Sequence, residues 1–323
     1  MNEIINGDAL SVLRNMQSES VNVCVTSPPY YGLRDYGTDG QIGMEQTPEE
    51  YIEKLVEVFR EVRRVLRPDG TLWVNIGDSY ATTSGGQPPT NTRNSCGHTA
   101  KKVPAGYKKK DLIGIPWMLA FALRADGWYL RQDIIWQKPN CMPESVKDRC
   151  TKSHEYIFLL SKSPKYYFDA EAISEPIAES TVKRCMQNID AQEGSYRQPG
   201  KTNGPMKAAL PRFGGSKYGD STAAEARTKS GKEYIAKARR NKRDVWSVST
   251  HGFKGAHFAV FPEELIRPCI LAGAPAGGVV IDPFFGSGTV GAVAMQEGRN
   301  FIGIELNPEY VSIAKNRVWG AET

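Results

Sequence analysis

The chain has 323 residues, of which 40% are hydrophobic and 24% are charged, and its formal net charge at pH 7 is +5. These values are typical of an ordinary globular protein, and no apolar run approaches the roughly 18 residues that a transmembrane helix needs. The first residues lack the basic-then-apolar order of a signal peptide, and the six cysteines include no C-x-x-C pair. We therefore expect a cytoplasmic protein with neither a disulfide framework nor a zinc site.

The positive charge is concentrated in two segments. Residues 176–250 carry 15 Lys and Arg against 7 Asp and Glu, and residues 81–110 carry 6 Lys and Arg and no acidic residue. Basic segments commonly contact polyanions, because Lys and Arg release counterions from a phosphate backbone. Two solvated loops would have the same composition, so charge alone leaves both interpretations open.

Strands and helices are expected to alternate in the first half of the chain. A short β-branched run at 21–25 predicts a buried strand, which leads directly into the rigid polar corner Thr26-Ser27-Pro28-Pro29-Tyr30. Apolar residues at helical spacing predict a helix over 48–66, with Thr47 as its N-cap. The remaining signals in this half predict a turn at 67–70, a strand at 71–76, a helix at 112–125, and strands at 129–136 and 155–160.

Residues 174–241 differ from the rest of the chain. They combine Gly and Pro clusters with many lysines and show little periodicity, which is typical of an insertion, a flexible loop region or a small irregular domain. Regular signals resume after them, with helices predicted at 262–272, 290–297 and 307–317 and strands at 278–282 and 300–305. The sequence thus predicts an α/β core, residues 1–173 and 250–323, interrupted by a basic insertion at 174–249.

A glycine loop joins the predicted strand at 278–282 to the helix that follows it. Gly286, Gly288 and Gly291 form a G-x-G-x-x-G pattern, and Glu305 ends the next strand 19 residues after Gly286. In this context the glycines allow close backbone approach, the helix N-terminus attracts an anion or polar group, and the acid can bind ribose hydroxyls. The pattern indicates a nucleoside-containing cofactor.

The surroundings of the loop distinguish two kinds of cofactor. A nicotinamide-binding domain needs several strands after this unit, whereas only 18 residues follow Glu305, so the neighbouring strands are expected to come from the first half of the chain. Asp282 and two phenylalanines stand where a pyrophosphate would need bare backbone amides. A carboxylate favours a cationic group, so the ammonium and sulfonium of S-adenosylmethionine fit better than NAD, which would imply an oxidoreductase.

Two motifs together resemble a known family. Thr26–Tyr30, with the sequence TSPPY, and Asp282–Thr289, with the sequence DPFFGSGT, are similar to motifs of the amino-directed DNA methyltransferases. The catalytic motif precedes the cofactor motif, which resembles the circularly permuted β class of that family. The likeness covers about residues 3–169 and 251–316. It implies a Rossmann-like methyltransferase fold, with a mostly parallel twisted sheet, helices on both faces, a permuted motif order and the basic insertion.

The resemblance also implies a set of catalytic residues. Ser27 Oγ and the Pro28 carbonyl would accept hydrogen bonds from the exocyclic amine of a flipped base and so localise the nitrogen lone pair. Pro29 would help to hold this carbonyl rigid, and Tyr30 would stack on the base. Trp136 and Lys138 belong to a supporting match and are expected to lie outside the site.

A second set of residues is implied for S-adenosylmethionine. Asp282 would lie near its methionine end, Glu305 would bind the ribose hydroxyls, and Asp8 would meet the adenine edge. His257 would either line the methionine side or be an ordinary surface residue. The full cofactor set is Asp8, Thr26, Phe261, Pro262, Asp282, Pro283, Phe284, Gly286, Ser287, Gly288, Thr289 and Glu305.

The target base is predicted from the first motif position. Family members with Ser there mostly methylate cytosine at N4, and those with Asp mostly methylate adenine at N6. Ser27 therefore favours N4-cytosine in double-stranded DNA, with N6-adenine as the alternative. Methylation at carbon 5 of cytosine would need the Pro268-Cys269 pair as nucleophile, but Cys269 lies on a predicted apolar helix and is expected to be structural.

Other functions and partners stay open. An RNA methyltransferase or a DNA-binding protein without catalysis would share many of these features. The insertion at 174–249 is the expected target-recognition region. Members of this class are often dimers, so a homodimer is compatible with the sequence, whereas a restriction endonuclease partner cannot be inferred from one chain.

Overall fold

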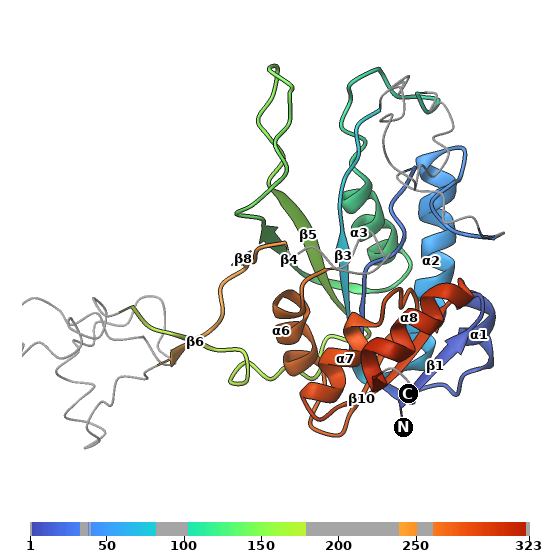
Figure 1. Cartoon of the computed structure of the whole chain (residues 1–323), viewed down its shortest axis with the longest axis vertical. Helices are drawn as coiled ribbons and strands as arrows, with labels where there is room; N and C mark the ends of the chain where they lie inside the picture. Colours follow the sequence, from blue (N-terminus) through green and yellow to red (C-terminus); the bar gives the residue numbers. More distant parts are fainter. Residues whose placement is uncertain are drawn as a thin grey trace, which may run out of the picture. The chain divides into compact units, whose positions relative to one another are not determined.

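The computed structural model describes residues 2–32, 38, 40–81, 103–178, 239–250 and 261–320 (Figure 1). The chain divides into two compact units. The larger one comprises Met1–Ile173 and Arg243–Thr323, and the smaller one comprises Ser174–Lys242. Among the described helices, none is both long enough and apolar enough to cross a membrane.

A mixed sheet forms the centre of the larger unit. Every pair of neighbouring strands is parallel, except that β5 is antiparallel to both of its neighbours. The α/β fold with a mostly parallel sheet is therefore confirmed. The strands, in order across the sheet, are β1 (Asn2–Asn6), β10 (Asn300–Glu305), β9 (Val279–Asp282), β2 (Val21–Thr26), β3 (Leu66–Ile76), β5 (His154–Ser161), β4 (Tyr129–Gln137) and β8 (Val245–Ser247).

Helices cover both faces of this sheet. On one face lie α1 (Ala9–Asn15), α2 (Pro48–Val65) and α3 (Ile115–Ala125), and on the other lie α6 (Glu263–Gly273), α7 (Thr289–Gln296) and α8 (Pro308–Trp319). The central strands supply apolar side chains to both faces. In β3, for example, Leu72 and Val74 join the first core and Trp73 joins the second.

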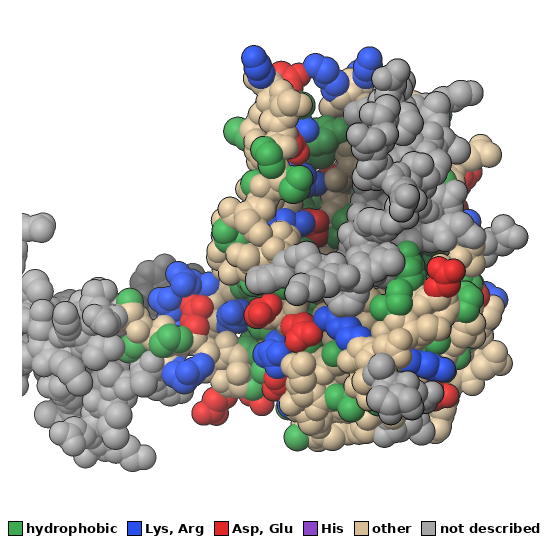
Figure 2. Space-filling view, viewed as in Figure 1, with side chains coloured by type: hydrophobic (Ala, Val, Ile, Leu, Met, Phe, Trp, Pro, Cys, Tyr) green, Lys and Arg blue, Asp and Glu red, His purple; other side chains and the backbone are tan. Residues whose placement is uncertain are grey.

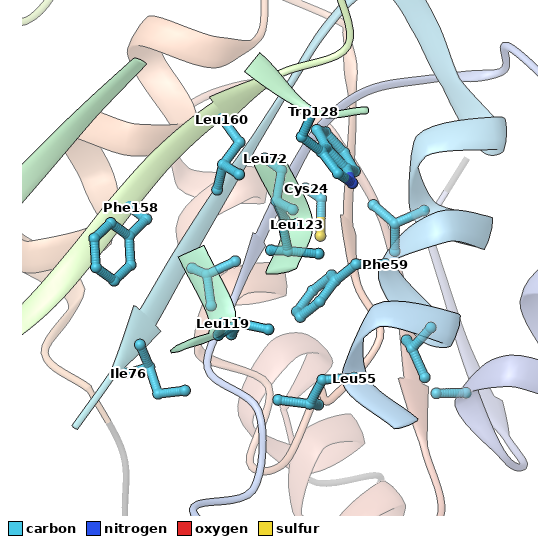
Figure 3. Packing of buried hydrophobic residues seen from close by; sticks show 14 of the residues in the cluster. Cys24, Leu55, Phe59, Leu72, Ile76, Leu119, Leu123, Trp128, Phe158 and Leu160 are labelled. Carbon is cyan, nitrogen blue, oxygen red and sulfur yellow. The ribbon is translucent and has the colours of Figure 1, made fainter. Parts of the chain in front are cut away.

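Figure 3 shows the first of these cores, in which Leu55 and Phe59 of α2 and Leu119 and Leu123 of α3 pack toward the sheet. All four side chains are almost completely buried. Replacing one such leucine by alanine typically costs about 2–5 kcal/mol, so this core makes a large contribution to the free energy of folding.

The connections reverse direction at one place in the sheet. From β9 the chain passes through α7 to β10, whereas from β2 it passes through α2 to β3 on the opposite side. The strands β9 and β2 are themselves neighbours, with Ile281 paired to Cys24. In open α/β sheets, ligands bind beyond the carboxyl ends of the two strands at such a reversal.

Two predicted boundaries differ from the structure. The predicted turn at 67–70 is an irregularity inside β3, because the pairing register passes from Val21–Leu66 to Val23–Thr71. The helix predicted from residue 112 begins at Ile115, because Gly114 is in the left-handed region with φ of 87°.

The described part of the smaller unit is a short antiparallel pair, β6 (Glu175–Pro176) and β7 (Arg239–Arg240). An ion pair joins Arg240 Nε to Glu175 Oε1 at 3.0 Å. Residues 179–238, which make up most of the predicted insertion, and residues 82–102 of the other basic segment lie outside the described residues. Residues 245–247, which fall within the predicted insertion, form the strand β8 in the sheet of the larger unit.

Candidate functional site

The two sequence motifs meet at the carboxyl ends of β2 and β9. Thr26, the last residue of β2, donates a hydrogen bond from Oγ1 to Asp282 Oδ1 at 2.6 Å, although 256 residues separate the two in the chain. The backbone N–H of Phe284 donates to the same carboxylate oxygen at 3.0 Å. The fold thus brings the predicted catalytic segment next to the predicted cofactor segment.

Asp282 is a buried acid in this junction. The pKa of its carboxyl group is raised from 3.8 to about 7: burial, the largest cause, and the negative charge of Glu305 raise it, and the hydrogen bonds from Thr26 and Phe284 oppose the shift. Within the described parts of the chain, no Lys or Arg forms an ion pair with Asp282. A buried carboxyl group without a cationic partner suits a ligand that brings its own positive charge.

Glu305 holds the glycine loop from its other side. The backbone N–H of Gly286 donates to Glu305 Oε2 at 2.7 Å, and that of Asn307 donates to Oε1 at 2.8 Å. Burial raises the pKa of Glu305, and these backbone hydrogen bonds oppose the shift. Gly288 has φ of 81°, and a Cβ added to it would lie 3.1 Å from Ala314 Cβ. The loop therefore needs glycine here both for its backbone conformation and for its packing.

The hydroxyl groups of the loop face Arg317 of α8. Arg317 Nη1 donates to Ser287 Oγ at 3.2 Å and to Thr289 Oγ1 at 2.8 Å, and its Nη2 bonds to Glu263 Oε1 at 2.9 Å. Both hydroxyl residues are buried. Arg317 therefore holds both hydroxyl groups of the glycine loop in place. Arg317 was not singled out in the sequence, where an arginine on a terminal helix carries no motif.

Asp8 lies at the same edge of the sheet. It follows β1, whose last residue, Asn6, pairs with Glu305 and donates from Nδ2 to the Glu305 carbonyl at 2.9 Å. Asp8 is exposed and caps α1, accepting a hydrogen bond from the Ser11 N–H at 2.8 Å. The other carboxylate oxygen is thus available at the surface beside the β10 terminus.

The remaining predicted cofactor residues lie at the ends of α6 and β9. Pro262 is the N-cap of α6, and Phe261 directly precedes it. Pro283 is buried, and the ring of Phe284 packs edge-on against Phe59 with the ring centroids 6.4 Å apart. His257 lies outside the described residues.

The proline corner after β2 is held by a helix. Tyr51 of α2, whose side chain is fully buried, donates a hydrogen bond from its hydroxyl to the Pro29 carbonyl at 2.8 Å. Pro28 is buried and Ser27 is half-buried. The corner is therefore fixed by contacts on its inner side and keeps Ser27 partly accessible.

Tyr30 ends this corner and points its hydroxyl into a polar cluster. The hydroxyl donates to Glu155 Oε2 at 2.7 Å and lies 3.4 Å from Asn75 Oδ1. Burial raises the pKa of Tyr30 well above its usual value, and the charge and hydrogen bond of Glu155 raise it further, while the nearby Ser27 hydroxyl opposes the shift. Glu155 forms an ion pair with Lys138. Lys138, which was expected to lie outside the site, is therefore connected to Tyr30 through Glu155.

The Pro268-Cys269 pair does not form a second catalytic centre. Cys269 is 1% exposed within α6 and packs in the second core, with its Sγ 3.8 Å from the Leu265 carbonyl. A buried thiol in an apolar core cannot reach carbon 5 of a base. The expectation of a structural cysteine is confirmed.

The chain is similar to characterised methyltransferases. Residues 21–316 match the protein family described as DNA methylase. The type II methyltransferase M.Cfr9I of Citrobacter freundii is 48% identical over 99% of this chain and 88% of its own length. The type II methyltransferase M.SmaI of Serratia marcescens is 45% identical over 98% of this chain and 90% of its own length.

Two solved structures share the fold. The PvuII DNA methyltransferase, described as cytosine-N4-specific, matches with a TM-score of 0.61 and 20% identity over 100% of this chain and 88% of that chain. A DNA modification methylase of Thermus thermophilus, solved in complex with S-adenosylmethionine, matches with a TM-score of 0.57 and 21% identity over 98% and 93% of the two chains.

Proposed function

The chain belongs to the N6/N4 DNA methylase family, and we propose that within this family it methylates the exocyclic N4 amine of a cytosine flipped out of double-stranded DNA. It is an S-adenosylmethionine-dependent type II DNA methyltransferase. The observation that carries the proposed amine methylation, for either base, is the hydrogen bond between Thr26 and Asp282. It fixes the Ser-Pro-Pro-Tyr corner beside a buried acid that has no described cationic side chain as its partner.

The residues fit S-adenosylmethionine in charge. Its α-ammonium group would be the cationic partner that Asp282 lacks among the described side chains. Glu305 accepts two backbone N–H bonds and retains lone pairs for the ribose hydroxyls. S-adenosylmethionine supplies the methyl group, so that an N–C bond forms as the C–S bond breaks, the electron pair stays on sulfur and the amine proton leaves to water. We propose Asp8, Asp282, Glu305 and the backbone of the glycine loop as its binding residues.

The corner after β2 is proposed to prepare the amine. The lone pair of an exocyclic amine is delocalised into the base ring, which makes the nitrogen a poor nucleophile. Ser27 Oγ and the Pro28 carbonyl would accept the two amine hydrogens and favour a tetrahedral nitrogen. The hydrogen bond from Tyr51 to the Pro29 carbonyl keeps this corner preorganised, and the ring of Tyr30 offers a face for the base.

Ser27 supports cytosine N4 over adenine N6. The preference comes from the resemblance, in which serine at this position accompanies N4 methylation, and the PvuII enzyme with the same fold is itself described as cytosine-N4-specific. Adenine N6 is the second candidate, because both amines need the same two acceptors. An RNA amine is the third.

Charged loops at the same edge support a polyanionic substrate. Figure 2 shows Lys and Arg side chains at the tips of the loops that project beyond the sheet after β3 and β4. The side chains of Lys108 and Lys110 are 87% and 74% exposed, and Lys110 bonds to Asp148 of the other loop at 2.6 Å. We propose that these loops contact DNA phosphates, and that residues 174–249 recognise the target sequence.

Two further features of the family are proposed for this chain. The strand β2, with the catalytic corner, comes before β9 in the chain although the two are neighbours in the sheet, and this order supports a circularly permuted arrangement. We also propose a homodimer, which light scattering of the purified protein tests directly by giving one or two times the 35.7 kDa mass of the chain.

Nucleoside analysis tests the proposed reaction. The protein is incubated with DNA of diverse sequence and labelled S-adenosylmethionine, and the DNA is digested and examined by mass spectrometry. N4-methylcytosine is expected from the wild type, with a loss of at least about 100-fold in Ser27→Ala and no loss in Ser312→Ala, an exposed serine on α8. N6-methyladenine would overturn the base assignment, and label in RNA alone would overturn the substrate.

A further inference from the structure

A partly buried ion pair lies beneath Tyr30. Glu155, near the start of β5, pairs with Lys138, just after β4, and their side chains are only 15% and 20% exposed. The Lys138 ammonium also lies 4.2 Å from the ring centroid of Trp136. Placing two charges away from water is costly, and apolar residues of similar size often stabilise a fold as well. The pair therefore invites a functional explanation.

Glu155 is held in place by more than its ion pair. Asn75 Nδ2, at the end of β3, donates to Glu155 Oε2 at 3.3 Å and to the Tyr156 carbonyl at 3.1 Å. A Cβ added to Gly77 would lie 2.8 Å from Tyr30 Cε2 and 3.4 Å from Glu155 Cδ. The tyrosine ring and the carboxylate thus pack closely against the backbone at the end of β3.

The carboxylate determines how the Tyr30 hydroxyl is used. A phenol has one hydrogen, and an ionised carboxylate can only accept, so the hydrogen of Tyr30 must point to Glu155 Oε2. The hydroxyl also lies 3.4 Å from Asn75 Oδ1, so its one polar atom ties Tyr30 to both β3 and β5.

We propose that Glu155, anchored by Lys138 and Asn75, is a positioning residue that holds the Tyr30 hydroxyl and thereby sets the orientation of the Tyr30 ring, on which the flipped base would stack. This inference rests on the proposed function. A ring held in this way needs no reorientation when the base arrives.

A double-mutant cycle tests the inference. The variants are Tyr30→Phe, which keeps the ring and removes the hydroxyl, Glu155→Gln, and the two combined. Single-turnover methyl transfer to DNA is measured with saturating S-adenosylmethionine. Glu155→Gln is expected to slow transfer by about 10- to 100-fold, the loss typical when a group that orients a reacting residue is removed. The Kd values for cofactor and DNA are expected to change less than about twofold.

The losses in transfer rate caused by Tyr30→Phe and Glu155→Gln are expected not to multiply in the double variant. If Glu155 acts through the Tyr30 hydroxyl, the double variant is expected to be no slower than the slower single variant. Rate losses that multiply, or wild-type transfer in Glu155→Gln, would overturn the inference. The matched control is Glu297→Gln, which breaks a partly buried ion pair with Arg267 between α6 and α7 and is expected to leave the transfer rate unchanged.

Folding and the overall reaction are checked separately. Should Glu155→Gln lower the melting temperature, the combined Lys138→Gln and Glu155→Gln variant removes both charges together, and it is expected to show the same slowed transfer. Wild-type transfer rates in that folded pair would also overturn the inference. Nucleoside analysis of the wild-type product establishes the reaction first. If the wild type is active and the rate losses of the two single variants multiply in the double variant, only the role of Glu155 is refuted.

Discussion

Asp282 makes the affinity for S-adenosylmethionine depend on pH. In the ligand-free protein, burial raises the pKa of this carboxyl to about 7. The cofactor ammonium that we place beside it would stabilise the ionised form and lower its pKa, so that the carboxyl stays ionised in the complex. Because the free protein holds the proton more tightly than the complex does, binding releases a proton, and a lower pH weakens binding.

The size of the effect follows from the two protonation states. With a free pKa of about 7, about nine-tenths of the Asp282 carboxyls are protonated at pH 6 and about one-tenth at pH 8. The Kd is therefore expected to be about tenfold higher at pH 6 than at pH 8, which corresponds to about 1.4 kcal/mol. Near pH 7, binding is expected to release about half a proton per site.

Isothermal titration calorimetry measures both quantities, since titrations in buffers of different ionisation enthalpy give the number of protons released. The matched variant is Asp282→Asn, whose amide oxygen can still accept from Thr26 and Phe284. The α-amino group of the ligand titrates near the upper end of this range, so the difference between wild type and variant is the decisive quantity. An equal pH dependence in the two proteins would refute the argument.

The same carboxyl has a predictable effect on stability. Its folded pKa exceeds the unfolded value of 3.8, so it destabilises the ligand-free fold increasingly as the pH rises from about 4 through 7. The upper limit of this effect at pH 8 is about 4 kcal/mol. At that pH, Asp282→Asn is expected to melt at a higher temperature than wild type without ligand and to gain less from added S-adenosylmethionine. A lower melting temperature for ligand-free Asp282→Asn would contradict the predicted direction of this effect.

Three substitutions test the packing around the site. In Gly303→Ala, the added Cβ would lie 2.4 Å from the Phe285 ring, so urea unfolding is expected to show a loss of about 1–3 kcal/mol; an unchanged midpoint would mean that the ring moves freely. Tyr51→Phe leaves the Pro29 carbonyl without its 2.8 Å donor, so it is expected to lower the free energy of unfolding by about 1–3 kcal/mol and to slow methyl transfer. A wild-type transfer rate in this variant would show that the corner does not depend on this hydrogen bond. Arg317→Met removes the donor to both hydroxyls of the glycine loop, so the KM for S-adenosylmethionine is expected to rise with that for DNA unchanged; parallel rises in both would indicate general loosening.

Features that depend on neighbouring residues were predictable from the sequence. The N-terminus of α2 is an example, because Thr47 and Glu50 form a capping box and Pro48 occupies the first turn, all within four residues of one another. The glycine loop with its flanking strands is another, because its geometry depends on a short continuous pattern.

Features that depend on distant pairing were not predictable. The strand β1 is polar and half-exposed, and it is a strand only because Asn2–Asn6 pair with β10 at the other end of the chain. The edge strand β8 has three residues and depends in the same way on β4. Short edge strands carry little pattern of their own.

The residues of the candidate site also fall into these two groups, predictable and not predictable from the sequence. The residues of the two motifs, such as Ser27 and Asp282, could be predicted because each motif is contiguous. Tyr51, Asn75 and Arg317 could not, because each is a single polar side chain whose relevance comes from what the fold places opposite it. Nothing in the sequence indicated that Glu155 reaches Tyr30.

The bond between Thr26 and Asp282 also sets an order of events during protein synthesis. At about 5–20 residues per second, the 256 residues between them take the ribosome roughly 10–50 s to add. Until β9 emerges, β2 lacks one of its two neighbours and exposes an apolar edge that invites mispairing. A nascent chain therefore carries its complete proline corner long before it has the acid and the glycine loop that we propose hold the methyl donor.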